Sequence, residues 1–370
     1  LMRSSAASDV YKRQIKNNKV RKETMNKIKR AALCIIVISV VFGIKLSNKE
    51  TDVSAKQTLF VMGDSKSSFY PRKRYPRQGW VQQFIPMLKS KGKVKPYHPE
   101  ECKDYEKVVR YDFHKYSIEN WSKGGISCKT FYETGRFAGI LKRIRKNDYV
   151  IIALQHNDKK PDVGEKVADY KHYLTYFTQH IQRKGGKVIF MTTPPKNYAD
   201  RKTFKIYVPE YRNTMLQVAK DFKCNYIDLS KLSTDYFNFR GKNYVNTLYM
   251  KLNPGQYPAW EQGINDDTHF QRDGARVLAR IIAVDLQANR QIPMLNKQFR
   301  QNTNALYATF QEAATYKNKK QYTDKSWNNM VKQRNNAWTI LYTPGVTNKQ
   351  CHKAEQSLRR SLKGLRRKHG

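Results

Sequence analysis

The stretch Leu59-Phe60-Val61-Met62-Gly63-Asp64-Ser65 joins a run of four apolar residues to a turn that presents a serine hydroxyl. A continuous apolar run bounded by turn-forming residues is typical of a strand that is buried on both of its faces. Three comparable runs occur later, at residues 149–154, 188–191 and 226–229. These runs predict the strands of a sheet that is covered on both sides.

Amphipathic stretches separate the apolar runs. The apolar residues of 137–144 follow the i, i+3, i+4, i+7 spacing of a helix, and a similar pattern runs through 211–222. Strands that alternate with helices predict a three-layer α/β/α sandwich with a central parallel sheet. Residues 90–118 are charged and tyrosine-rich without a clear period. We interpret them as an insertion, either a surface excursion or part of a cleft wall.

Polar residues follow two of the apolar runs directly. Gly63-Asp64-Ser65 follows the first run, and His156-Asn157-Asp158 follows the run at 149–154. Because the carboxyl ends of parallel strands meet at one edge of a sheet, we expect Ser65 and Asn157 to lie close together there. A tripeptide of turn-forming residues after a strand is often only a turn, so the position carries the argument.

A third polar string, Asp266-Asp267-Thr268-His269, precedes an amphipathic stretch at 272–286. A nucleophilic hydroxyl needs a base, and the base needs a carboxylate that orients it. Ser65, His269 and Asp266 supply these three groups. The Asp-x-x-His spacing lets one turn hold the imidazole by its distal nitrogen. Asp267 lacks this spacing, and its alternative role is an acidic cap of the following helix.

These strings, in this order, resemble the blocks of the SGNH hydrolases, the GDSL-type esterase superfamily, and their spellings are most similar to its rhamnogalacturonan acetylesterase-like branch. The resemblance covers residues 57–290 and implies a flavodoxin-like sheet with Ser65 as nucleophile. It further implies an oxyanion hole formed by the N–H groups of Ser65 and Gly125 and by the side-chain amide of Asn157. Asp64 would hold the serine loop, and His156 would lie behind the reacting groups.

Two positions depart from the family pattern. Gln155 stands where related acetylesterases usually have glycine, and Ile126 stands where they usually have arginine. We expect Gln155 to narrow the cleft or to shift the loop of Asn157. The chain has no H-E-x-x-H string, paired Cys/His spacing or glycine-rich phosphate loop. We therefore expect a site that uses neither a metal nor a cofactor.

The formal net charge of +41 predicts a polyanionic partner: nucleic acid, an anionic cell wall or an acidic polysaccharide. The charge is +8 in residues 1–55 and +11 in residues 303–370, which leaves +22 for the remainder. This spread indicates a basic surface and not a single binding tail. The expected partner is an acetylated anionic polysaccharide, with possible contact to an anionic cell wall and no nucleic acid.

The N-terminal part reads as a targeting segment. Residues 1–24 are interpreted as an artefact or untranslated extension, because 9–14 resemble a translated sequencing adapter and Met25 opens a basic stretch. A charge-free run at 31–44 follows, so residues 25–55 are expected to be a signal peptide, or an N-terminal anchor, with a linker. The protein is then expected to be secreted or bound to the surface of a Gram-positive bacterium.

The five cysteines are scattered, and we expect mostly free thiols, with a Cys102–Cys128 bond as the alternative. We expect the esterase domain to span 56–295. Three amphipathic patterns at 303–368 predict a small helical bundle that resembles the FIVAR module of Gram-positive surface proteins and is separable from the esterase. Thr347 and Gln350 form a capping box for its last helix.

The expected function is that of a secreted serine esterase that removes O-acetyl groups from a pectin- or rhamnogalacturonan-like polysaccharide. Two alternatives remain. One is a non-catalytic wall- or glycan-binding protein with a degenerate esterase domain, which the Gln155 departure favours. The other is a lipid or aryl esterase of the same superfamily, for which no exposed lipid-binding helix is evident.

Overall fold

The computed structural model describes residues 56–104 and 106–368. The expected signal or anchor segment, the linker up to Ala55 and Cys34 lie outside these residues. The described part of the chain forms one compact unit that begins at Lys56. Within it, no helix combines the length and the apolarity that crossing a membrane requires.

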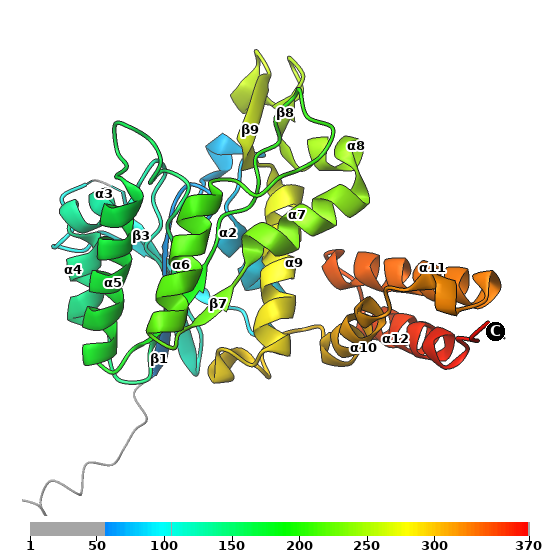
Figure 1. Cartoon of the computed structure of the whole chain (residues 1–370). Coiled ribbons are helices and arrows are strands. Elements are labelled where there is room, and N and C mark those ends of the chain that lie inside the picture. Colours follow the sequence, from blue (N-terminus) through cyan, green and yellow to red (C-terminus); the bar gives the residue numbers. More distant parts are fainter. Residues whose placement is uncertain (1–55, 105, 369–370) are drawn as a thin grey trace, which may run out of the picture. The chain divides into compact units, whose positions relative to one another are not determined.

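A seven-stranded sheet lies at the centre of the fold (Figure 1). Its strands, in chain order, are β1 Gln57–Gly63, β2 Lys93–Tyr97, β3 Val108–Asp112, β4 Tyr116–Asn120, β5 Tyr149–Ala153, β6 Lys187–Met191 and β7 Asn225–Ile227. In space the order is β2-β3-β4-β1-β5-β6-β7. Strands β4, β1, β5, β6 and β7 are parallel, whereas β3 runs antiparallel to both of its neighbours, β2 at the edge and β4. The connection reverses direction between β1 and β5, which creates the crevice where such sheets bind ligands.

Helices cover both faces of the sheet, as the alternation of strands and helices predicts (Figure 1). The helices of this part are α2 Trp80–Phe84, α3 Cys128–Glu133, α4 Arg136–Arg143, α5 Val167–Arg183, α6 Pro209–Asp221, α7 Leu229–Arg240, α8 Lys242–Asn246 and α9 Arg272–Ala288. Successive side chains of a strand point to opposite faces. Leu59 and Val61 therefore join the core under α2, α7 and α9, and Phe60 and Met62 join the core under α3 to α6. The three-layer α/β/α prediction is confirmed.

Residues 90–118, which lack a clear period and which we interpret from the sequence as an insertion, supply β2, β3 and most of β4 of the central sheet. Strand β4 is fully buried although it contains polar residues. Two of them have partners on neighbouring strands: the Ser117 hydroxyl lies 3.0 Å from that of Thr58, and Glu119 accepts a hydrogen bond from Arg110 at 2.7 Å. Partners on neighbouring strands make polar residues tolerable in a buried strand, and no local period reveals them.

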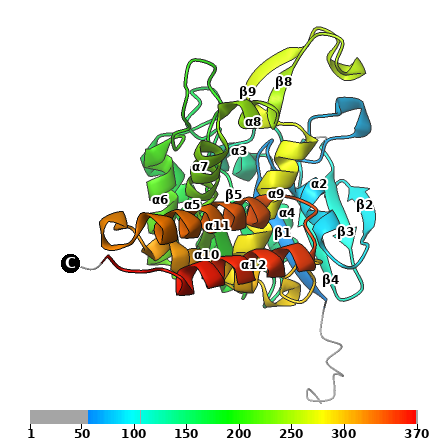
Figure 2. The same cartoon turned by 90° about the vertical axis from the view of Figure 1, so that its right-hand side faces the viewer.

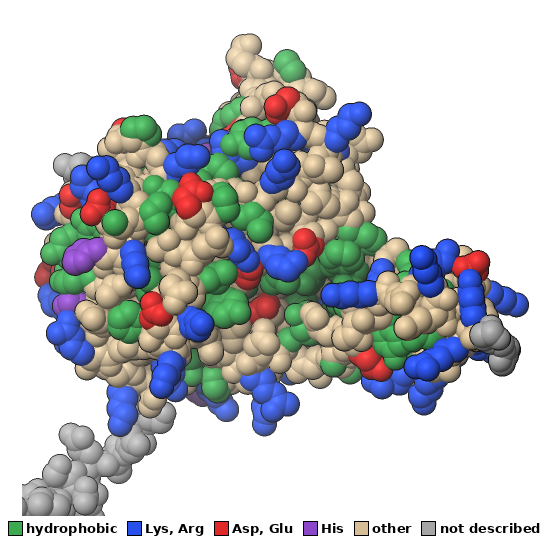
Figure 3. Space-filling model, viewed as in Figure 1, with side chains coloured by type: hydrophobic (Ala, Val, Ile, Leu, Met, Phe, Trp, Pro, Cys, Tyr) green, Lys and Arg blue, Asp and Glu red, His purple; other side chains and the backbone are tan. Residues whose placement is uncertain are grey.

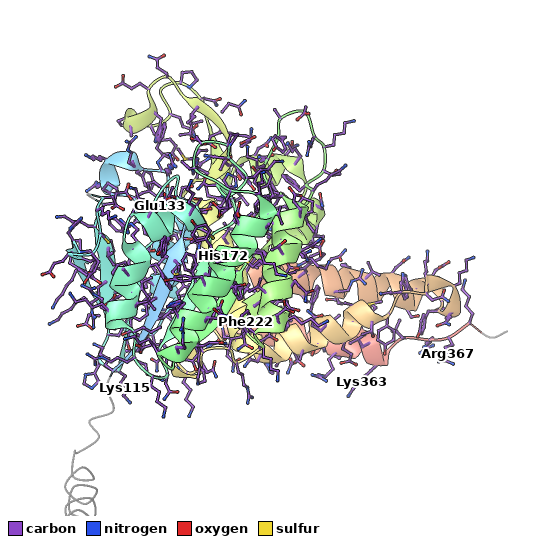
Figure 4. The ribbon with its side chains drawn as sticks, turned by 60° about the vertical axis from the view of Figure 1, so that its left-hand side comes forward. Lys115, Glu133, His172, Phe222, Lys363 and Arg367 are labelled. Carbon is purple, nitrogen blue, oxygen red and sulfur yellow. The ribbon has the colours of Figure 1, made fainter. Side chains whose placement is uncertain are left out.

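One smaller prediction also needs correction. The run at 226–229 is only partly a strand, because β7 ends at Ile227 and Leu229 already opens α7. The expectation of free thiols is confirmed: all four cysteines of the described residues are free, and Cys102 and Cys128 are not joined. Figure 4 labels His172 on α5 and Phe222 just after the end of α6. These two helices cover the face of the sheet whose core contains Cys128.

A separate antiparallel pair, β8 Tyr249–Leu252 and β9 Ile264–Phe270, projects beyond the carboxyl edge of the main sheet (Figure 1). Its pairing is irregular, with a register shift between Tyr249 and Lys251. Helix α9 begins two residues after β9 ends. The pair therefore places residues 266–269 near the ends of β1 and β5.

Three further helices follow, α10 Asn304–Thr315, α11 Asp324–Tyr342 and α12 Asn348–Lys363, and the predicted capping box opens the last of them. Figure 2 shows them lying against α9. The ring planes of Phe239 on α7 and Trp338 on α11 stack with centroids 4.7 Å apart. The Arg280 guanidinium on α9 is buried and donates to the Leu341 carbonyl oxygen at 2.8 Å. The predicted bundle thus exists and shares a core with the sheet domain.

Candidate active site

The loop after β1 presents Ser65 at the carboxyl edge of the sheet. A Cβ atom on Gly63 would lie 2.5 Å from the Ser67 Oγ, so only glycine fits where the chain leaves the strand. Asp64 then accepts the Lys66 backbone N–H on its carboxylate at 2.9 Å and the Ser67 N–H on its carbonyl at 3.0 Å. These bonds give Asp64 the loop-holding contacts that the family resemblance implies.

Ser65, His269 and Asp266 form one chain of hydrogen bonds. The His269 Nε2 lies 2.9 Å from the Ser65 Oγ, and the His269 Nδ1 lies 2.6 Å from the Asp266 Oδ2. Ser65 and His269 are 204 residues apart in the sequence. The structure therefore brings together the three residues that the spacing of their motifs singles out, in the geometry of a nucleophile, a base and an orienting carboxylate.

Asp266 and His269 do not lie in a simple turn, as the sequence suggested, but in the irregular strand β9. The Asp266 Oδ1 accepts the backbone N–H groups of Thr268 at 2.8 Å and His269 at 3.1 Å. These two bonds reproduce locally the tight curvature of a turn. They leave the Asp266 Oδ2 aimed at the imidazole, which explains how the three-residue spacing works inside a strand.

The surroundings of these hydrogen-bonded residues favour a neutral His269 and an ionised Asp266. Burial opposes ionisation of Asp266, but the hydrogen bond and charge of His269 and the two backbone N–H groups hold its pKa well below the usual range. Burial is the main reason that the pKa of His269 is lowered, and the Arg77 and Lys66 cations lower it further, against the opposing effect of Asp266. His269 is thereby available as a proton acceptor near neutral pH.

The predicted oxyanion donors Ser65, Gly125 and Asn157 lie on the loops that follow β1, β4 and β5. Asn157 is buried and gives one of its two amide hydrogens to the Ile126 carbonyl oxygen at 2.9 Å, so the second hydrogen is left for a ligand. Gly125 has φ +78°, a conformation that favours glycine. Within the described residues, the backbone N–H groups of Ser65 and Gly125 have no acceptor. Their roles as oxyanion donors remain a prediction.

The two positions next to Asn157 have distinct surroundings. Gln155 is fully buried and its side-chain oxygen accepts the Thr193 N–H at 2.9 Å, which links the ends of β5 and β6. This bond is what the glutamine adds where relatives have glycine. The His156 ring packs on Tyr207 with centroids 4.8 Å apart. Burial, followed by the nearby Lys66 cation, lowers the pKa of His156 far below its ordinary value, so it is neutral.

Sequence reasoning missed a buried carboxyl pair behind the oxyanion loop. Asp158 is inaccessible and accepts the Cys128 backbone N–H at 2.7 Å, while the Glu165 N–H donates to the Asp158 carbonyl at 2.9 Å. Burial raises the pKa of both carboxyls, that of Glu165 to about 9, so the pair holds a proton at neutral pH. The pair ties the loop after β5, which carries Asn157, to the start of α3, which follows Gly125. No local pattern points to these bonds.

The Cys128 thiol lies beside this carboxyl pair, and the three groups are close enough together to hold a metal ion in principle. Burial raises the pKa of Cys128 far above its ordinary value, and a thiol must lose its proton to bind a metal. Asp158 already serves a backbone N–H. The cluster therefore fits a hydrogen-bonded joint between two loops better than a metal centre.

Lys66 is a second group that the motifs did not single out. It follows the nucleophile, is buried, and places its Nζ 3.6 Å from the Asp64 Oδ2. Burial lowers its pKa to about 8 even though Asp64 opposes this effect. A cation held at this position adds positive potential behind the serine, which suits a site where negative charge develops.

Comparisons with known proteins agree with this geometry. The family of GDSL-like lipases/acylhydrolases matches residues 59–282. The chain is 27% identical over 230 residues to the rhamnogalacturonan acetylesterase RhgT of Bacillus subtilis. The aligned part covers 62% of this chain and 89% of the relative. It is 30% identical over 170 residues to the probable rhamnogalacturonan acetylesterase YesY of the same organism, covering 45% and 74%.

Among solved structures, the crystal structure of protein YxiM from Bacillus subtilis superposes with a TM-score of 0.50 at 25% identity. The match covers 64% of this chain and 57% of that one, so it spans little more than half of the solved protein. The chain belongs to the GDSL-like lipase/acylhydrolase family, the SGNH hydrolases, and is a carboxylic ester hydrolase. Within this family it is similar, at modest identity, to rhamnogalacturonan acetylesterases. The FIVAR-like resemblance of the C-terminal helices stays a prediction.

Proposed function

We propose that this protein is a secreted or surface-bound serine esterase that removes O-acetyl groups from a pectin- or rhamnogalacturonan-like polysaccharide. The observation that carries the proposal is the hydrogen-bonded chain Ser65–His269–Asp266, with distances of 2.9 and 2.6 Å, at the switch point of the sheet. Intact contacts of this kind oppose the reading as a degenerate binding protein.

In the first half of the reaction, the Ser65 Oγ attacks the acetyl carbonyl carbon while the His269 Nε2 takes the hydroxyl proton. The carbonyl oxygen becomes an oxyanion that the N–H groups of Ser65, Gly125 and Asn157 stabilise. Asp266 holds the imidazole and stabilises its positive charge. The tetrahedral intermediate then collapses: the C–O bond to the sugar breaks, His269 protonates the departing sugar oxygen, and an acetyl-serine remains.

In the second half, a water molecule takes the place of the sugar. His269, again neutral, accepts a proton from the water as its oxygen attacks the acetyl-serine carbonyl. The same three donors stabilise the second oxyanion. Collapse breaks the bond to the Ser65 Oγ, which recovers its proton from His269, and acetate leaves.

The named relatives support the substrate class, since two of them are described as rhamnogalacturonan acetylesterases. The charge supports an anionic polymer: Lys and Arg side chains are spread over the whole face seen in Figure 3, and acidic side chains are far fewer. A basic surface attracts polyuronates and anionic walls through long-range electrostatics. The proposed localisation rests on the pattern of residues 25–55.

The test is acetate release from a panel of acetylated glycans, with Ser65→Ala as the control. We expect release from acetylated pectic polymers by the wild type and none by the variant. A fluorophosphonate probe should label only the wild type; absence of labelling would support the degenerate alternative. Preferential cleavage of octanoyl over acetyl esters would instead favour a lipid esterase and overturn the proposal.

A further inference from the structure

A cleft of about 450 Å³ opens next to the catalytic serine, between the loop 68–77 on one side and strands β2 and β3 on the other. One of its lining residues hydrogen-bonds to the Ser65 backbone, and a second lies near the Ser65 side chain. The Tyr70 hydroxyl donates to the Ser65 carbonyl oxygen at 2.9 Å, and a Cβ atom on Gly124 would lie 3.9 Å from the Ser65 Cβ. The cleft therefore lies beside the loop that carries Ser65.

One part of the cleft is apolar and exposed. Only four large hydrophobic side chains of the described residues are exposed, and two of them line this cleft: Phe69, 42% exposed, and Val94, 54% exposed. Pro71 and Pro96 extend the same surface. Exposed apolar groups gathered at one place usually mark a binding surface. An aromatic ring beside a catalytic serine suits the C–H face of a sugar ring.

The rest of the cleft is basic. Arg74, Arg77 and Lys107 line it, against the single carboxylate of Glu106. None of the three cations pairs with a carboxylate elsewhere in residues 56–104 and 106–368. Unpaired cations beside an apolar platform suit a ligand with both an apolar face and a negative charge.

Of the three cleft cations, Arg77 belongs to a segment that is tied to the end of the strand carrying His269. Its backbone bridges to that of Gln271, and the neighbouring Gln78 N–H donates to the Phe270 carbonyl at 3.1 Å, beside His269. Its guanidinium lies over the Tyr70 ring at 4.7 Å, and its Nε is buried with no acceptor in the described structure. A guanidinium that is held over a ring with a donor unmet can bind a carboxylate.

We propose that this cleft is a subsite for a hexuronate residue of the polysaccharide, adjacent to the acetylated sugar, in which Phe69 packs on the sugar face and Arg77 binds the carboxylate. The inference deepens the proposed function and rests on it for the position of the acetyl group. It assigns to β2 and β3 the cleft wall that the sequence left undecided.

Binding tests the subsite without relying on turnover. Calorimetry on the Ser65→Ala protein would compare an acetylated oligouronate with the same oligomer after methyl esterification of its carboxylates. We expect tighter binding of the anionic form. Adding Arg77→Gln should weaken binding of the anionic form about tenfold and leave the esterified form nearly unchanged, since one charge-assisted contact is lost. Phe69→Ala should weaken both forms alike, because the sugar face is common to them.

Matched variants separate the subsite from general charge. Arg77→Lys keeps the cation without the planar fork and should recover part of the loss, and Arg74→Gln tests a fully exposed cation of the same cleft. Arg360→Gln, which changes the charge equally on the exposed side of α12, should have no effect. Equal weakening by Arg360→Gln and Arg77→Gln, or unchanged binding by Arg77→Gln, would overturn the subsite. Uronate binding with no acetate release by the wild type would instead overturn the proposed function alone.

Discussion

Two regions of this molecule are built in opposite ways. At the carboxyl edge of the sheet, buried polar groups from distant loops are held by hydrogen bonds, as in the contacts of Asn157 with Ile126 and of Asp158 with Cys128. At the far end, α10 to α12 pack apolar faces against α7 and α9, with Arg280 as the one deeply buried cation of the contact. The first region holds the groups proposed to react, and the second contributes mainly to the stability of the fold. Substitutions should therefore separate activity from folding according to the region in which they lie.

The largest effect is expected from Ser65→Ala. Loss of a triad nucleophile typically lowers kcat by up to ~10⁶-fold. Because the hydroxyl makes one hydrogen bond within the described residues, to His269, the melting temperature should stay close to that of the wild type. Stopped assays for acetate, beside circular dichroism, measure both quantities. Retained hydrolysis would remove Ser65 from the role of nucleophile.

The second-largest effect is expected from removal of residues 303–368, which contain α10 to α12. This removal would expose Tyr236 and Phe239 on α7 and leave the Arg280 guanidinium without its carbonyl partner. Loss of this many buried aromatic contacts should cost ~3–5 kcal/mol or more of unfolding free energy. Denaturant titration of the truncated chain measures this loss. A truncated protein that is as stable and as active as the full chain would restore the separable bundle that the sequence suggests.

Asp158→Ala should lower kcat by about 10- to 100-fold, because misplaced oxyanion donors weaken transition-state stabilisation. Asp158→Asn keeps an acceptor for the Cys128 N–H and should lose less. Leu358→Ala, which empties a buried site in α12, is the matched control from the other region. It should cost ~2–5 kcal/mol of stability with kcat unchanged below the melting temperature. Equal kcat for all three variants would contradict the division between the regions.

The smallest effect concerns pH. His269 must be neutral to accept a proton, and its pKa is lowered below the ordinary 6.5. Activity should therefore be full above that value and fall as the pH drops through the pKa of His269 in the folded protein. Arg77→Gln removes a cation that lowers this pKa, so the acid limb should move to higher pH, whereas Arg77→Lys should leave it in place. Profiles of kcat/KM against pH on a small acetyl ester show the shift.

The apolar runs predicted β1, β5 and β6 because these strands are covered on both faces, so burial and sequence agree. Strand β2 escaped the same reasoning because four of its five residues are exposed. Strand β4 escaped for the opposite reason: it is buried, but the polar Glu119 owes its burial to Arg110 and to the Trp121 ring N–H at 3.0 Å. A hydrophobic pattern reveals a buried strand only when the buried residues are apolar.

The same distinction applies to the site. Ser65, Asp266 and His269 stand out because catalysis requires those residue types in that order, and Asn157 stands out because it follows a strand. Asp158 does not, because its partner is the backbone N–H of Cys128, which is remote in the sequence. Lys66 lies only two residues from its carboxylate partner Asp64, but nothing in that spacing indicates that both side chains are buried.

The edge position of β2 and β3 has a consequence for how this enzyme can change over evolutionary time. β2 pairs only with β3, and this pair forms one wall of the cleft beside Ser65 without contributing a member of the catalytic chain. Insertions, exchanges or point changes across 93–109 can therefore alter which sugars fit while β1, β5 and β9 keep the reaction intact. If the proposed subsite is correct, substrate preference lies on the most replaceable margin of the sheet, and new specificities can arise there while the residues that carry hydrolysis stay unchanged.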